Sequence, residues 1–369
     1  MTVSKFNKME SIALILMITI NHIILYLPKI IISDLQSSSA INIIYISLLA
    51  LLIVFIITKL LKKFPYLDIL DISKFFGGNF LKIMLGIILL LYFIFINSMI
   101  LRNFSENLKI IYFQKTPIAI IVISFIIAMT ATNSLGIKST IRANLLITPI
   151  VLFILLFIYL ANSEYFYVDR LFPILGTGFT PTFLSGISNL FSFGGIIFIY
   201  LLPPHLEDSK EIKKISTISI ILSAIYLFFS VVSLLLIFPF FSSTEQVMPL
   251  YLLTRYIEFG RFFQRLDAIF LLIWILSVTS YLSIILAFIL EIFKKITNIQ
   301  HTKPVVWLFA LILFDISLIP KNLIQIRFLT NSVYKYLVLS IVFLICPLVL
   351  VLANLKLKRQ KKKDGDTFE

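Results

Sequence analysis

Long apolar runs separated by short polar segments dominate the pattern of hydrophobic and polar positions along this chain. A helix that crosses a bilayer needs about 20 mostly apolar residues. By that criterion the pattern predicts ten transmembrane helices, which we number one to ten in chain order. They cover residues 10–32, 40–60, 80–101, 117–135, 143–161, 183–203, 216–239, 266–292, 304–320 and 333–354. No soluble domain is predicted between them.

Two of these spans carry polar or helix-breaking residues within the apolar run. In span six the segment 185–205 reads SGISNLFSFGGIIFIYLLPPH. Backbone that leaves the helix at membrane depth must be buried in protein or line an aqueous cavity, and in secondary transporters such a broken span marks the substrate site. The interruptions are Ser192, Gly194 and Gly195 in span six, and Asn21, His22 and Pro28 in span one.

Each half of the chain therefore begins with an interrupted span, which is typical of two inverted five-helix repeats. We predict an all-α polytopic membrane protein with a 5+5 inverted-repeat, broken-helix (LeuT-like) transporter fold. A single transmembrane domain would cover residues 1–354, with repeats at about 10–161 and 183–354. Residues 355–369 would form a basic cytoplasmic tail.

Composition and charge support this fold class and add an orientation. Hydrophobic residues make up 60% of the chain and charged residues 14%, whereas soluble domains average about 45–50% and about 25%. With the N-terminus inside, the inner segments hold 20 Lys and Arg and the outer segments 11. The positive-inside rule then places both termini in the cytoplasm. The net charge of +14 is accordingly attributed to membrane topology and not to nucleic acid.

For two polar segments the sequence allows two interpretations each. The loop 240–265 is predicted either as an aromatic-rich helix across the outer mouth or as an ordinary surface loop. The tail KLKRQKKKDGDTFE is predicted to lie next to anionic lipid headgroups, with a protein partner as the alternative.

Polar groups from four spans form the candidate substrate site. Polar residues inside a membrane tend to face the bundle interior, and amides released at a half-helix N-terminus suit a carboxylate. The alternatives are a packing role for the polar side chains and, for the glycines, close helix–helix contact. The candidates are Asn21 and His22 in span one, Tyr92 and Asn97 in span three, Ser192, Phe193, Gly194 and Gly195 in span six, and Ser277 and Ser280 in span eight.

Catalytic chemistry is not indicated. The chain has three histidines, the single Cys346 and no paired carboxylates within its spans. We therefore expect neither an enzyme nor a metal site nor a cofactor.

Several segments, in order along the chain, resemble the spore germination permeases, the membrane-embedded B subunit of Ger-type germinant receptors in the amino acid–polyamine–organocation superfamily. They are LYLPKII at 25–31, KTPIAII at 115–121, GIKSTIRANLLITPI at 136–150, RLFPILGTG at 170–178, LLPPHLEDSKEIKK at 201–214 and FFQRLDAIFLLIWILS at 262–277.

The resemblance implies a central pocket between spans one, three, six and eight that binds a small germinant, typically an amino acid. It also implies a multi-pass protein of the spore inner membrane, assembled with an A subunit and a C-subunit lipoprotein and triggering germination. Two departures stand out: Asn21-His22-Ile23 falls where relatives often have small residues, and Ile197 falls where many carry an acid. The amine of a ligand would then contact Asn21 or Asn97.

Two other functions remain open for this fold. One is an amino acid or cation symporter. The other is an ion channel or scaffold subunit that binds no ligand of its own.

Overall fold

The computed structural model describes residues 4–239, 248–257, 266–299 and 303–365. Within these ranges eight helical segments are long and apolar enough to cross a membrane. Two shorter apolar helices, Ile118–Ser134 and Pro304–Leu318, coincide with predicted spans four and nine. Each of the ten predicted spans falls on helical structure, and the prediction of an all-α polytopic membrane protein is confirmed.

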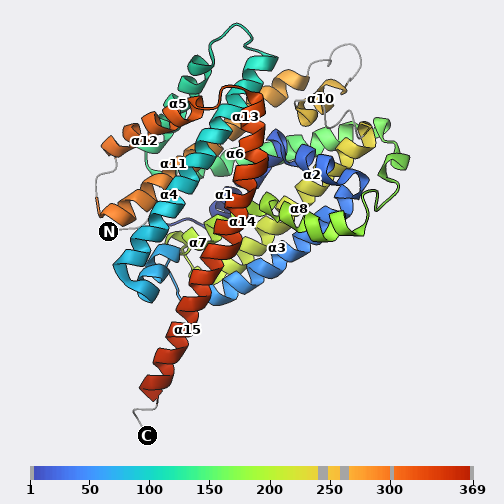
Figure 1. Cartoon of the computed structure of the whole chain (residues 1–369). Coiled ribbons are helices and arrows are strands. Elements are labelled where there is room, and N and C mark those ends of the chain that lie inside the picture. The colour runs from blue at the N-terminus through green and yellow to red at the C-terminus, as the bar shows by residue number, and fades with distance from the viewer. Residues whose placement is uncertain (1–3, 240–247, 258–265, 300–302, 366–369) are drawn as a thin grey trace.

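The helices of the first half form spans one to five (Figure 1). They are α1 (Lys8–Leu25) and α2 (Leu27–Leu35) in span one, then α3 (Ser39–Leu61), α4 (Ile69–Ile111), α5 (Ile118–Ser134) and α6 (Ile137–Ala161). Helix α4 is kinked at Gly78, whose φ of 74° favours glycine. Span three therefore begins after this kink.

The helices of the second half are more irregular than those of the first. Span six consists of η4 (Thr180–Leu184), η5 (Ser185–Ile196) and α7 (Ile197–Leu201), and it is followed by α8 (Ile212–Ile237), α10 (Pro249–Arg255), α11 (Leu266–Thr297) and α12 (Lys303–Leu318). The last span joins α13 (Leu323–Phe328), η8 (Leu329–Tyr334), α14 (Lys335–Ser340), η9 (Ile341–Ile345) and α15 (Cys346–Gly365).

The two interrupted spans lie at the centre of the bundle. The most apolar stretch of α1 is 89% buried and that of span six is 78% buried, whereas the corresponding stretch of α6 is only 33% buried. Apolar residues on α6 and its neighbours face outward, as expected for helices in contact with lipid. Polar side chains on α1 and η5 are therefore held inside protein.

Span one breaks beside Pro28, which is only one of its three predicted interruptions. Asn21 and His22 lie inside the regular helix α1, which ends at Leu25. The break is at Tyr26, whose φ of −159° is not helical, and α2 begins immediately after it with Pro28 in its first turn. Proline clashes with the preceding turn of a helix, whereas Asn and His only lower helix propensity, so the break forms beside the proline.

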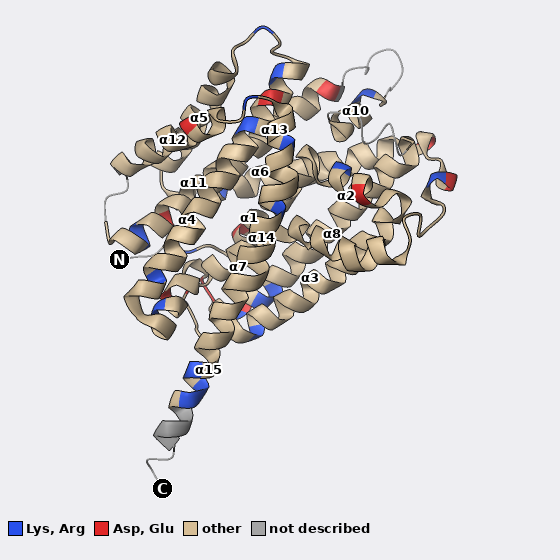
Figure 2. Ribbon diagram, in the orientation of Figure 1, with Lys and Arg blue, Asp and Glu red and all other residues tan. Residues whose placement is uncertain are grey.

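The loop and the tail are described in part. Residues 248–257 contain the short helix α10, and the remainder of the predicted 240–265 segment, residues 240–247 and 258–265, lies outside the described residues. The tail continues α15 as a helix to Gly365, away from the bundle (Figure 1). Figure 2 shows a run of Lys and Arg on this extension.

A clasp closes the end of the bundle where α1 begins. We define it as residues 4–7 paired with residues 203–207. The Phe6 amide donates to the His205 carbonyl at 2.6 Å, and the Glu207 amide donates to the Phe6 carbonyl at 3.3 Å. The Lys5 ammonium donates to the Pro204 carbonyl at 2.9 Å, and the ring of Phe6 stacks on His205 at 5.0 Å. The N-terminal segment thus ties span one to the end of span six.

The clasp should weaken in acid because of His205. Burial lowers the pKa of His205 from 6.5 to about 4, and its Nδ1 lies 3.1 Å from the Ser4 carbonyl. The unfolded chain takes up this proton below about pH 6.5 and the folded chain does not. Stability is therefore lost as pH falls from about 6.5 to about 4, by up to about 3 kcal/mol.

The measurement is thermal unfolding of the detergent-solubilised protein between pH 7.5 and pH 4, with the variant His205→Phe as the comparison. Phenylalanine keeps the stack on Phe6 but cannot titrate, so the difference between the two proteins isolates this group. An equal pH slope in both proteins would contradict the prediction.

Candidate functional site

Spans one and six cross at the glycine pair of η5. A Cβ atom at Gly195 would lie 3.2 Å from both the Ile15 carbonyl oxygen and Thr19 Oγ1 of α1. A Cβ atom at Gly194 would lie 3.1 Å from the Tyr334 hydroxyl of the last span. The adjacent glycines therefore permit close contact on two sides. This is the alternative role predicted for them, close helix–helix contact.

Span six is distorted at the predicted position, but it is not fully unwound. Residues Ser185–Ile196 form a 3₁₀ helix, and Phe193, with φ −94° and ψ 31°, interrupts its helical geometry. The α-helix resumes at Ile197. All four candidates of this span, residues 192–195, are buried at the kink. The predicted release of backbone amides is thus replaced by a change of helix type.

Asn21 and Ser277 bind each other across spans one and eight. Ser277 Oγ lies 3.2 Å from Asn21 Oδ1, and Asn21 Nδ2 donates to the Met17 and Ser277 carbonyls at 2.9 and 3.3 Å. The amide of Asn21 is satisfied by protein groups on both sides. Both residues therefore hold the two spans together in this conformation.

A buried aromatic cluster surrounds His22. Nδ1 of His22 bonds the Tyr26 hydroxyl, and Nε2 lies 3.1 Å from the Tyr281 hydroxyl and 3.5 Å from that of Tyr334. The imidazole also stacks on Tyr334 at 5.2 Å, and Phe191 packs edge-on against the same tyrosine. We call these five residues the tyrosine cluster. Only His22 was predicted, because aromatic residues in a membrane span carry no sequence signal that separates a site from lipid-facing surface.

Three buried polar atoms near these contacts have no hydrogen-bond partner in the described part of the chain. They are Thr19 Oγ1, Ser192 Oγ and Asn97 Oδ1. Asn97 uses its Nδ2 to reach the Leu282 carbonyl of span eight at 3.3 Å, which leaves the oxygen unused. Tyr92, on the same helix, is buried and packs on Phe93. Unpartnered buried polar groups are costly and call for an explanation, and a ligand is one.

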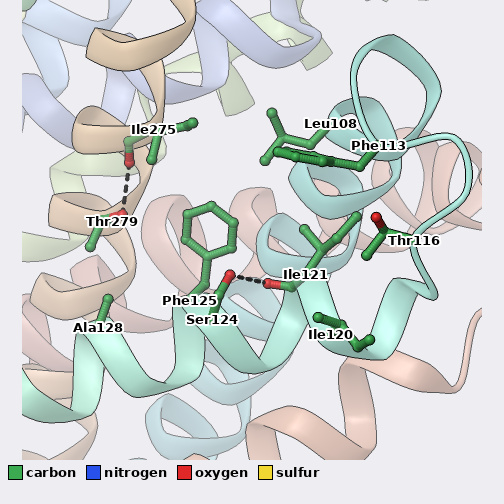
Figure 3. Close-up of a pocket in the computed structure, with 10 residues that line it drawn as sticks. All are labelled: Leu108, Phe113, Thr116, Ile120, Ile121, Ser124, Phe125, Ala128, Ile275 and Thr279. Atoms are coloured by element: carbon green, nitrogen blue, oxygen red, sulfur yellow. Dashed lines mark hydrogen bonds between the residues drawn. The ribbon is translucent and has the colours of Figure 1, made fainter.

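Ser280 lies away from this centre. Its hydroxyl is 3.0 Å from Asn144 Oδ1 of α6, so it contributes to contact between α11 and α6. The neighbouring Thr279 lines a lateral cavity of about 440 Å³ (Figure 3). There its hydroxyl and that of Ser124 each bond a carbonyl of their own helix at 2.7 Å. Apart from these two residues and Thr116, the residues that line the cavity are apolar, which distinguishes it from the polar centre.

One supporting residue was missed by the sequence analysis. Asn42 on α3 donates to the Thr182 and Gly186 carbonyls of span six at 2.7 and 3.1 Å, and it accepts from Asn189 Nδ2 at 3.1 Å. These bonds satisfy carbonyls that the π and 3₁₀ geometry leaves without regular α-helical partners. The single asparagine within the predicted second span was the available signal.

The fold and the buried polar centre define a multi-pass membrane protein of the broken-helix transporter class. Across 94% of this chain, the fold matches 78% of Mhp1, a nucleobase-cation-symport-1 family transporter solved in a closed conformation with bromovinylhydantoin bound, with a TM-score of 0.63 and 13% identity. A family described as spore germination protein matches residues 5–326. The chain belongs to this family, as its resemblance had predicted.

Individual relatives agree with this family assignment. The chain is 25% identical over 294 residues to spore germination protein B2 of Bacillus subtilis (strain 168), covering 78% of this chain and 77% of that protein. It is 24% identical over 352 residues to spore germination protein YndE of the same organism, covering 92% and 93%. It is 23% identical to spore germination protein KB over 78% of this chain and 79% of that protein. These relatives are germination proteins, and the fold neighbour is a transporter.

Proposed function

We propose that this chain is the germinant-sensing membrane subunit of a spore germinant receptor. It binds a small germinant, an amino acid, at the crossing of spans one and six, and binding triggers germination. We further propose that it acts in the spore inner membrane with an A subunit and a C-subunit lipoprotein. Family membership supports the role in germination, and the buried polar site supports the binding of a small germinant.

The proposal that the protein binds a ligand is supported by three buried polar atoms that have no hydrogen-bond partner among the described residues. A hydroxyl or amide oxygen that is buried without a partner costs about 1–3 kcal/mol. Thr19, Ser192 and Asn97 come from spans one, six and three. A small polar ligand entering between these spans would satisfy all three. The tight packing at Gly194 and Gly195 fits a closed state that must open to admit it.

Ligand binding can act as a signal if it shifts the equilibrium between the closed bundle and a state in which the central spans separate. The bonds of Asn21 to Ser277 and of His22 to Tyr281 hold span one against span eight. A ligand that binds only when these spans separate favours the separated state in proportion to its differential affinity. The partner subunits would then respond to the separated state.

A symporter is the second candidate, favoured by the fold match to a cation-coupled transporter. The two are separated by uptake of labelled amino acids into vesicles that contain this protein alone. Accumulation driven by an ion gradient would favour the symporter. A ligand that binds without accumulating would favour the receptor.

Removing the unpartnered hydroxyls should reduce germinant response without destabilising the protein. Thr19→Val and Ser192→Ala each delete a buried group that lacks a partner, so unfolding should become harder by about 1 kcal/mol or stay unchanged. The loss of a ligand contact should raise the germinant concentration for half-maximal dipicolinate release about fivefold to tenfold, equivalent to about 1–1.4 kcal/mol. Spores carrying each variant provide the measurement.

Two matched controls accompany these variants. Thr130→Val removes a buried hydroxyl that bonds its own helix at 2.6 Å, and Ser223→Ala removes an unpartnered one from α8. Neither should alter the response. Normal germination in Thr19→Val and Ser192→Ala spores, with the protein present at wild-type level, would favour a scaffold that binds no ligand here.

A further inference from the structure

The loop between spans five and six exposes large apolar side chains. It covers residues 163–178, between the end of α6 and the start of η4. Span six follows it and reaches the clasp at its other end, so the loop lies at the end of the bundle opposite the clasp, and we call it the outer loop. Six of its apolar side chains are between 40% and 61% exposed: Tyr165, Tyr167, Val168, Phe172, Ile174 and Leu175.

The outer loop is fixed to the end of span one. The Ser37 hydroxyl donates to the Pro173 carbonyl at 2.6 Å, and the hydroxyls of Ser38 and Thr177 lie 2.8 Å apart. The loop therefore presents its apolar side chains from a backbone that is already held in place. A surface prepared in this way loses little conformational entropy when it binds a partner.

The hydrocarbon core of the bilayer cannot cover these side chains. The outer loop consists of two short 3₁₀ turns, η2 (Ser163–Tyr165) and η3 (Val168–Leu171), joined by irregular backbone. Irregular backbone is not exposed to lipid within the hydrocarbon region, because its polar groups would lack partners there. The loop must then lie at the membrane surface. Large apolar side chains that gather on such a surface mark an interaction site.

The charges of the outer loop favour a protein over anionic lipid. Its charged residues are Glu164, Asp169 and Arg170. Arg170 points inward, since its Nη1 donates to the Leu236 carbonyl at 3.0 Å and to the Ile237 carbonyl at the C-terminus of α8, where a cation is favoured. Glu164 and Asp169 are exposed, and neither forms an ion pair with any described residue. Exposed carboxylates repel anionic headgroups and attract a basic protein surface.

We propose that the outer loop is the docking surface for the C-subunit lipoprotein, which meets it with an apolar patch edged by Lys or Arg. A lipid-anchored protein has no span of its own, so it must contact this chain outside the hydrocarbon core, where the outer loop lies. Val168 and Phe172 would enter the apolar patch, and Asp169 would pair with its basic edge. The identity of this partner rests on the proposed function.

A fluorescent reporter on the loop tests what covers it. Val168→Cys is labelled with bimane, while the native Cys346 is fully buried. The full chain is placed in phosphatidylcholine nanodiscs, alone or together with the lipoprotein. Bimane emission should be that of a water-exposed probe in the first sample and shift to the blue in the second. A blue shift without the lipoprotein would assign the loop to lipid, and no shift in either sample would mean that nothing docks there; both results overturn the proposal.

Leu135→Cys is the matched control for the reporter. It is an exposed apolar residue on the loop between spans four and five. That loop lies near the clasp end, since Arg142 contacts Glu10 of α1 at 3.6 Å. Its bimane emission should not respond to the lipoprotein.

Substitutions at the loop test the two parts of the contact. Binding of the lipoprotein to the detergent-solubilised full chain is measured by biolayer interferometry. Phe172→Ser should weaken it about tenfold, whereas Phe113→Ser, an exposed residue on the loop after α4, should not change it. Asp169→Lys should lower the association rate about tenfold at low salt, and Asp169→Asn less. Wild-type binding by Phe172→Ser or faster association by Asp169→Lys would overturn the proposal. Ile174→Ser replaces Phe172→Ser if that variant does not fold.

These measurements need neither spores nor germinant, so they fail separately from the proposed function. If Thr19→Val and Ser192→Ala spores germinate normally while the lipoprotein still binds at the outer loop, the proposed ligand site fails and the docking surface stands. If those variants weaken the germinant response while the lipoprotein does not bind, the docking surface fails and the ligand site stands.

Discussion

Spores that carry Gly195→Ala are expected to lose their germinant response, and the protein is expected to lose stability. The added Cβ would lie 3.2 Å from the Ile15 carbonyl oxygen and from Thr19 Oγ1. A backbone oxygen in the most deeply buried helix cannot move without moving α1 itself. Overpacking of this kind costs about 1–3 kcal/mol, and the larger Gly195→Leu should cost more. Thermal unfolding in detergent and dipicolinate release measure the two effects.

Gly86→Ala is the matched control. Its Cβ would lie 2.9 Å from both Cδ1 and Cγ1 of the half-buried Ile296 side chain, which can adopt another rotamer, and would meet no backbone atom this closely. We expect stability within about 1 kcal/mol of wild type and a normal response. A Gly195→Ala protein with wild-type stability and response would show that spans one and six do not cross in contact at this glycine.

The second large effect is expected from Lys295→Met at the clasp end. The Lys295 ammonium contacts Asp68 Oδ2 at 2.5 Å and Asp71 Oδ2 at 2.7 Å, and the Asp68 side chain is only 5% exposed. Asp68 also caps α4 by accepting from the Asp71 amide at 2.9 Å. Without the lysine, two carboxylates face each other with one of them buried. Breaking such a pair costs about 3 kcal/mol or more.

The expected result is a lowered unfolding temperature at pH 7 that recovers partly on acidification, because protonation of one carboxylate removes the uncompensated charge. Lys294→Met is the control, since Lys294 makes no ion pair within the described residues. The double variant Lys295→Met with Asp68→Asn should recover much of the loss. A Lys295→Met protein as stable as Lys294→Met would mean that the contacts contribute no net stability.

The clasp and the tyrosine cluster together hold the bundle closed. At one end, residues 4–7 pair with residues 203–207, and midway the tyrosine cluster packs around His22. A small polar cavity opens at the opposite end, beside Tyr26.

Much of the fold was predictable because a helix that crosses a bilayer must be mostly apolar over about 20 residues. All ten predicted positions are helical, and the two interrupted spans are the central ones. Of the three interruptions predicted in span one, Pro28 lies beside the break, whereas Asn21 and His22 do not interrupt the helix. The helix there stays regular because Asn21 and His22 find partners on span eight, and it ends beside Pro28 instead.

The candidate site was predictable only in part. Asn21, His22, Ser192, Gly194, Gly195 and Ser277 lie in the central contacts, whereas Ser280 contacts α6. Thr19, Tyr281 and Tyr334 were missed. A hydroxyl in a membrane helix commonly bonds its own backbone, so its sequence position does not reveal whether it has a partner.

The sequence by itself determined the membrane class, the helical spans, the family and the two spans that the bundle is built around. Those properties follow from local composition and from the length needed to cross a bilayer. Only the tertiary structure decided which polar atoms are partnered and how the adjacent glycines pack. Pairing depends on residues far apart in the chain, such as Asn21 with Ser277 and His22 with Tyr281, which helix packing alone brings together.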